Sequence, residues 1–105
     1  MEHFATLKID KEELDYYEHT MKTAMFNAGD GNLVTMWTVE FDDGHFADLK
    51  IVDCSRREGG PWSEVVLFDS NGCEVDCTEV DDSLRGEWWV RDGENENYTV
   101  VVEEA

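Results

Sequence analysis

Cysteine and histidine are the residue types that most often bind metals or take part in catalysis, and this sequence contains three of each. Cys73 and Cys77 lie four positions apart in one predicted strand, which separates them by about 13 Å at roughly 3.3 Å per residue. Neither Cys54 nor the histidines form a CxxC or HxxxH motif; the histidines are His3, His19 and His45. We therefore predict free thiols, solvated histidines and no metal site.

Residues 92–96 carry oxygen ligands at alternate positions, as calcium-binding loops do. Asn97 stands where such a loop requires glycine, and residues 99–102 have the pattern of a strand, so we interpret the segment as an acidic turn. The sequence also lacks a nucleophile elbow, a phosphate-binding glycine loop and a dinucleotide-binding fingerprint. We predict no catalytic residues, no cofactor and no enzymatic activity; a small enzyme is the least favoured reading.

Carboxylates dominate the remaining chemistry, because 26 Asp and Glu residues face only 8 Lys and Arg and the formal net charge is -18. This imbalance destabilises a compact protein by self-repulsion. Carboxylates at alternate strand positions are roughly 6.6 Å apart, close to the separation of neighbouring phosphates on a nucleic-acid strand. Three groups of acids have suitable spacing: Glu74, Asp76, Glu79, Asp81 and Asp82; Asp92, Glu94 and Glu96; and Glu12, Asp15 and Glu18.

The size and composition of the chain limit its class. A length of 105 residues fits one domain, so we treat residues 1–105 as a single acidic domain with a hydrophobic core. Direct binding to DNA, RNA or an anionic membrane is disfavoured, because phosphate contacts need clustered Lys and Arg. No apolar run approaches the ~20 residues of a membrane span, and the first ten residues lack the design of a signal peptide. We expect a cytoplasmic protein.

The elements that position these residues begin with a helix. Asp10 and Glu13 form a capping box, which predicts a helix start after Asp10. Apolar residues then recur at three- and four-residue spacing up to Gly29 and Gly31, and they are Leu14, Tyr17, Met21, Ala24, Met25 and Ala28. The predicted helix therefore has one apolar stripe, which must pack on a sheet to be stable.

Three consecutive hairpins follow the helix, with loops at residues 42–44, at Asn71-Gly72 and at residues 93–95. We predict that the first loop has three residues, with Gly44 in the left-handed conformation, and that the second is a two-residue turn. The resulting opposed pairs are Val39 with Ala47, Trp37 with Leu49, Thr35 with Ile51, Phe68 with Val75, Val66 with Cys77, Trp88 with Val100 and Val90 with Tyr98.

The predicted fold class is α+β, with one N-terminal helix packed on a predominantly antiparallel six-stranded sheet built from these hairpins. Residues 3–9 are a weaker candidate for a seventh strand, and the turn at residues 58–61 divides two sheet regions. Apolar residues also fall on the outer face, namely Met36, Phe46, Val52, Leu67, Trp89 and Val101. One helix of roughly 17 residues cannot cover both faces, so the sheet curls into a partial barrel, forms two layers or dimerises.

In size, charge and helix-plus-sheet plan, the chain resembles the small inhibitors of phages and mobile elements that mimic DNA, such as the uracil-DNA glycosylase inhibitor and some anti-restriction or anti-CRISPR proteins. The local likeness is confined to residues 64–72, where an Asp-Ser-Asn-Gly turn ends an apolar strand. Hairpin chemistry alone produces such turns, so this likeness does not assign the chain to a family. It implies a one-to-one complex with a nucleic-acid enzyme and no activity of the chain's own.

Two functional hypotheses follow from these patterns. In the first, the acids bind a basic protein surface, such as the groove of a nucleic-acid-binding protein, and the chain acts as a mimic and inhibitor. In the second, the chain is a generic acidic interaction module that uses Trp89 and Val101, or the Trp62 loop, as an apolar anchor. The sequence is compatible with a monomer or a homodimer. The candidate partner-binding residues are Glu74, Asp76, Glu79, Asp81, Asp82, Asp92, Glu94, Glu96 and Trp89.

Overall fold

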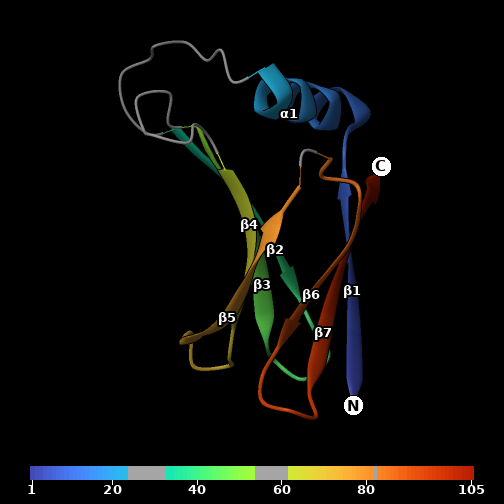
Figure 1. Ribbon diagram of the computed structural model, residues 1–105. Helices are drawn as coiled ribbons and strands as arrows, with labels where there is room; N and C mark the ends of the chain where they lie inside the picture. The colour runs from blue at the N-terminus through green and yellow to red at the C-terminus, as the bar shows by residue number, and fades with distance from the viewer. Residues whose placement is uncertain (24–32, 54–61, 82) are drawn as a thin grey trace.

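The computed structural model describes residues 1–23, 33–53, 62–81 and 83–105. The described part of the chain contains seven strands and one helix (Figure 1). The elements are β1 (Glu2–Ile9), α1 (Lys11–Thr23), β2 (Leu33–Glu40), β3 (Phe46–Asp53), β4 (Trp62–Phe68), β5 (Glu74–Val80), β6 (Gly86–Arg91) and β7 (Asn97–Glu104). The candidate seventh strand is confirmed as β1, and the helix starts directly after Asp10, as predicted.

The α+β class with one N-terminal helix is consistent with the structure. The strands form two sheets that do not close into a barrel, so the predicted six-stranded meander is imprecise and the alternative of two layers describes the strands better. One sheet is an antiparallel meander in the order β2-β3-β4-β5, and the other has the order β1-β7-β6. β1 runs parallel to β7, while β6 and β7 form an antiparallel hairpin. The turn at residues 58–61 lies outside the described residues, but β3 and β4 on either side of it pair in one sheet. The two sheets therefore divide between β5 and β6.

The predicted registers of the first and third hairpins are confirmed, including Val39 opposite Ala47 and Trp88 opposite Val100. Gly44 has a φ of 94°, a left-handed conformation that glycine adopts with little strain. In the second hairpin, Val66 does face Cys77, but the prediction of Val75 opposite Phe68 is wrong.

The second hairpin differs because its loop is one residue longer than a two-residue turn. Asp69 N–H donates to the Cys73 carbonyl, and Gly72 N–H donates to the Asp69 carbonyl. The Asp69 carboxylate also accepts hydrogen bonds from the backbone N–H groups of Asn71 and Cys73. These contacts place Glu74 opposite Phe68, and a register shift between Leu67 and Phe68 then restores the predicted pairing at Val66.

The core lies between the two sheets and takes residues from both. Its largest fully buried members include Leu49 and Leu67 from the four-stranded sheet and Val90, Tyr98 and Val100 from the three-stranded one. The sequence analysis put Leu67 on the outer face; the structure buries it in the core instead, because it pairs with Ala47. Val66 is the residue of this run that faces outward.

The helix α1 lies across one end of the sheets rather than along a face of either (Figure 1). Leu14 is fully buried in the core, and Tyr17 packs against the core's edge. The side chains of the remaining stripe, from Met21 to Ala28, lie outside the described residues. The described part of the chain contains no helix that is long and apolar enough to cross a membrane.

Candidate functional site

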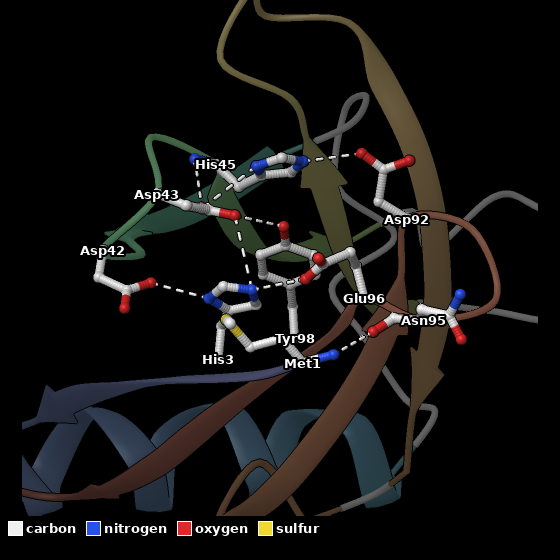
Figure 2. Close-up of polar contacts among 9 residues, drawn as sticks. All are labelled: Met1, His3, Asp42, Asp43, His45, Asp92, Asn95, Glu96 and Tyr98. Atoms are coloured by element: carbon white, nitrogen blue, oxygen red, sulfur yellow. Dashed lines mark hydrogen bonds and ion pairs between the residues drawn. The ribbon is translucent and has the colours of Figure 1, made fainter.

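A dense group of titratable side chains lies where the start of β1 meets the loops of the first and third hairpins (Figure 2). Its centre is a stack of three rings. The ring of Tyr98 on β7 lies parallel to His3 on one side, with centroids 4.5 Å apart, and close to parallel to His45 on the other, also at 4.5 Å. We call His3, His45, Tyr98 and the acids around them, Asp42, Asp43, Asp92 and Glu96, the histidine cluster.

Each ring nitrogen of His3 faces a carboxylate (Figure 2). Nδ1 lies 2.8 Å from Asp42 Oδ1, and Nε2 lies 2.7 Å from Glu96 Oε2. Since carboxylates accept and do not donate, the arrangement suits an imidazolium that donates from both nitrogens. Hydrogen bonds to Asp42 and Glu96 raise the pKa of His3 above its ordinary value, although burial opposes them.

Asp43 connects the two histidines through its two oxygens. Its Oδ2 accepts a 2.5 Å hydrogen bond from the Tyr98 hydroxyl and lies 3.7 Å from His3 Nε2. Its Oδ1 accepts a hydrogen bond from the backbone N–H of His45. Burial by itself raises the pKa of Asp43, but these hydrogen bonds and the neighbouring imidazoles outweigh burial and hold that pKa below its ordinary value.

The ring of His45 is also held by acids. Its Nε2 lies 2.8 Å from Asp92 Oδ2. Its Nδ1 is buried and lies 3.2 Å from Asp43 Oδ1, but the geometry is not that of a hydrogen bond. Burial, followed by the hydrogen bond to Asp43, raises the pKa of Tyr98 above its ordinary value. The cluster therefore places four carboxylates and two imidazole rings around a neutral phenol.

This geometry determines which chemistry the cluster can perform. A histidine that acts as a general base needs a nitrogen free to reach a substrate, and both nitrogens of His3 are occupied. Donor atoms of His3, Asp42 and Asp43 lie within 4.8 Å of one another and could take part in a metal site. Both nitrogens of His3 already lie within hydrogen-bond distance of a carboxylate. The geometry therefore favours a hydrogen-bonded network that connects three chain segments.

The prediction that the histidines are solvated is wrong for His3, which is 6% exposed, and for His45, which is largely buried. It is right for His19, which is exposed on α1. A signal for His3 was present in the sequence, because His3 alternates with Ala5, Leu7 and Ile9, the residues of β1 that face the core. No comparable local pattern identified the acids that pair with it.

A second charged group fastens α1 to the sheets. The Arg85 guanidinium contacts Asp15 at 3.0 Å, Glu18 at 2.8 Å and Glu104 at 2.7 Å. The Glu18 carboxylate also accepts hydrogen bonds from the Leu84 backbone N–H and the Ser83 hydroxyl. The predicted helical row of acids is therefore partly used inside the molecule, and only Glu12 of that row is free of ion pairs in the described structure.

The predicted acidic row on β5 is split between two faces of the sheet. Glu74 pairs with Phe68 and lies on the outer face, whereas Asp76 pairs with Leu67 and lies on the core face. Asp76 accepts a 2.8 Å hydrogen bond from the Arg91 backbone N–H, which connects the edges of the two sheets. Glu79 and Asp81 are exposed, and Asp82 lies outside the described residues.

The predicted row in the third hairpin is also divided by the structure. Asp92 and Glu96 turn toward the histidines (Figure 2). Glu94 is the exposed residue of the three. Trp89, the remaining candidate, is exposed on the outer face of the three-stranded sheet. The described cysteines, Cys73 and Cys77, are free, as predicted, and both are exposed.

The outer face of the four-stranded sheet gathers acids from all four strands. Its described carboxylates are Glu40, Asp48, Glu64, Glu74 and Glu79, and its described cation is Lys50; we call these residues the acid face. None of the five acids has an ion pair in the described structure. Glu64 stands directly opposite Glu79 on the neighbouring strand. Stacked rings of Phe46 and Phe68 lie beside Glu40 and Glu74.

The outer face of the three-stranded sheet is different in charge and shape. Its rows across β1, β7 and β6 are Glu2-Asn97-Arg91, Phe4-Thr99-Trp89 and Thr6-Val101-Glu87, with Lys8 beside Glu103 at the far end. We call this surface the aromatic face. Phe4 and Trp89 are exposed on it, and its two cations partly balance its three carboxylates.

Comparison of the chain with family models, curated proteins and solved structures found no match.

Proposed function

We propose that this chain is a non-catalytic binding protein whose acid face docks on a basic surface of another protein. The observation that carries the proposal is the placement of Glu64 directly opposite Glu79 on neighbouring strands, without an ion pair. Like charges in this position destabilise a sheet. A cationic partner would remove that repulsion, so the energetic cost in the free protein becomes a source of binding energy in the complex.

The same face supports a more specific partner, a nucleic-acid-binding protein. Four of the five acids follow a diagonal across the strands: Glu40, Asp48, Glu64 and Glu79. Each of the first two steps crosses one strand, about 4.8 Å, and two residues, about 6.6 Å, which separates neighbouring acids by roughly 8 Å, comparable to the separation of neighbouring phosphates. We propose that this diagonal of acids occupies a phosphate-binding groove and excludes nucleic acid from it. Catalysis is not part of the proposal, because both nitrogens of His3 and Nε2 of His45 lie within hydrogen-bond distance of internal carboxylates.

The test is affinity capture from the native host with immobilised wild-type protein and two variants of equal charge. Glu64→Gln/Glu79→Gln changes the acid face, and Glu12→Gln/Glu13→Gln removes two exposed acids from the first turn of α1. We expect the wild type and the helix variant to retain the same basic proteins. The acid-face variant should lose them, and raising NaCl from about 0.05 M to about 0.5 M should weaken retention roughly tenfold or more.

Each captured protein is then tested with its own nucleic acid. Wild-type protein should displace a labelled DNA or RNA from it, and Glu64→Gln/Glu79→Gln should do so at least tenfold less well. Retention that is equal for both variants would overturn the acid face as the binding surface. Retention that is specific to the acid face without displacement of nucleic acid would leave a basic partner but overturn mimicry.

A further inference from the structure

The aromatic face exposes two large apolar side chains in one row. Trp89 on β6 is 69% exposed and Phe4 on β1 is 61% exposed, and both flank Thr99 on β7 in register. Thr99 itself is buried beneath them. An adjacent hollow of about 230 Å³ is lined by Glu2, Trp89, Arg91, Asn97 and Thr99. An exposed apolar row beside a hollow on one surface marks that surface as a candidate interaction site.

The charges on the aromatic face indicate which kind of molecule binds there. Two copies of a chain with a net charge of -18 repel each other, and the repulsion is smallest where each contributes a nearly balanced face. The acid face has five carboxylates and one lysine among its described side chains. The aromatic face has two cations against three carboxylates, and Lys8 and Glu103 already pair at 3.5 Å. Arg91 has no ion pair in the described structure, which leaves it available.

From this row, hollow and charge balance, we propose that a second copy of the chain packs face to face on the aromatic face, about a two-fold axis parallel to β7. Such an axis exchanges the positions of β1 and β6, because these strands flank β7 on opposite sides.

The register of the face makes this arrangement self-complementary. In the row Glu2-Asn97-Arg91, the exchange sets Glu2 against Arg91 of the second copy. In the next row, it sets Phe4 against Trp89 of the second copy. The axis repeats each contact, so the dimer gains two ion pairs and two aromatic pairs, with apolar contacts at its centre and charges at its margin.

The homodimer and the proposed acid-face complex depend oppositely on salt. Salt screens the repulsion between two acidic copies, so self-association strengthens as the NaCl concentration rises. Binding of the acid face to a cationic partner weakens under the same change. The dimer does not depend on the proposed function, and the direction of the salt effect separates the two.

Sedimentation equilibrium over a wide range of protein concentration measures the dimer directly, at about 0.05 M and about 0.5 M NaCl. We expect a reversible dimer whose dissociation constant falls as salt is added. Trp89→Ser should raise that constant at least tenfold. Met36→Ser removes an exposed apolar side chain from the other sheet and should leave it unchanged. Both side chains are exposed, and equal thermal melting of the dilute variants checks that each still folds.

A charge exchange tests the orientation of the copies. Glu2→Arg and Arg91→Glu should each weaken the dimer several-fold, and the double variant should restore the wild-type constant, because the pair is rebuilt in reverse. A wild type that stays monomeric at both salt concentrations overturns the proposal. It does so even if Trp89→Ser abolishes capture of a different protein, because the aromatic face would then bind that protein and not a second copy. A dimer insensitive to Trp89→Ser overturns the assigned face, and failure of the double variant to recover overturns the two-fold arrangement.

Discussion

At the scale of single residues, the histidine cluster shows how a very acidic chain can bring carboxylates together. Asp42, Asp43 and Glu96 come from two different loops and would repel one another without His3. The imidazolium is charged only while it keeps its second proton. The stabilisation that it provides must therefore depend on pH in a defined direction.

We predict that replacing His3 by glutamine removes a stabilisation that is lost as the pH rises. The folded-state pKa of His3 is raised above its ordinary value of 6.5, so the contribution is fully present below about pH 6.5 and is lost as pH rises through the folded pKa. The difference in unfolding free energy between the wild type and His3→Gln should shrink across this interval. Urea unfolding at several pH values measures it, and an NMR titration of His3 gives the folded pKa.

The control is His19→Gln, which changes an exposed histidine on α1 and should leave the pH profile of stability unchanged. A stability difference for His3→Gln that stays constant or grows with pH would contradict the assignment of His3 as an imidazolium.

A second prediction concerns the hydroxyl of Tyr98, which donates to Asp43 in the centre of the cluster. Tyr98→Phe keeps the ring stack but leaves Asp43 without its shortest hydrogen bond. We expect a loss of about 1.5–3 kcal/mol in unfolding free energy, the range for hydrogen bonds to charged groups. Thermal or urea denaturation measures it, and Tyr16→Phe, on the exposed surface of α1, should cost nothing measurable. Equal stability of the two variants would show that the hydroxyl does not stabilise Asp43.

At the scale of elements, α1 is attached to the sheets at few points. Among the described side chains of α1, Leu14 is the apolar one that is fully buried. Arg85 forms ion pairs with Asp15 and Glu18 of α1 and with Glu104 at the end of β7. Short isolated helices are marginal in water, so these contacts should determine how often α1 opens.

We predict that Arg85→Gln increases local opening of α1 without unfolding the sheets. Amide hydrogen exchange in residues 14–19 should accelerate severalfold more than exchange in β3 or β4. Lys8→Gln removes the same charge from a single exposed ion pair with Glu103 and should leave exchange in α1 unchanged. Uniform acceleration across helix and strands would indicate that Arg85 contributes to global stability instead.

At the scale of the whole molecule, the two outer faces differ in charge. The acid face concentrates unpaired carboxylates, while the aromatic face approaches neutrality. The net charge still opposes the compact state, and salt should relieve this opposition.

We predict that the melting temperature rises with salt. Raising NaCl from about 0.05 M to about 0.5 M should stabilise the protein by on the order of 1 kcal/mol, or about 4–8 °C. The measurement uses dilute Trp89→Ser protein, so that dimer formation does not contribute. Glu64→Gln/Glu79→Gln in the same background should gain less from salt, because part of the repulsion is already absent. A melting temperature that falls with salt would show that attractive ion pairs outweigh the repulsion.

The features that sequence reasoning found correctly are local ones. The start of α1 after Asp10, the three-residue loop closed by Gly44 and the registers of the first and third hairpins all follow from residues close together in the chain. Alternation and turn chemistry act over a few residues, which is why they can be read directly. The predicted loop of the second hairpin was one residue too short, because the Asp69 side chain stabilises a longer loop.

By itself, then, the sequence determined the acidity, the helix start, the strands and most hairpin registers, because each depends on composition or on neighbouring residues. Tertiary structure alone decided that β7 pairs with β1, across nearly the whole chain, and that the strands divide into two sheets. Tertiary structure also decided which acids remain on the surface of the protein without an internal partner. Asp76, Asp92 and Glu96 are turned to internal partners by contacts between distant segments, and such contacts depend on which surfaces are buried together rather than on any local pattern.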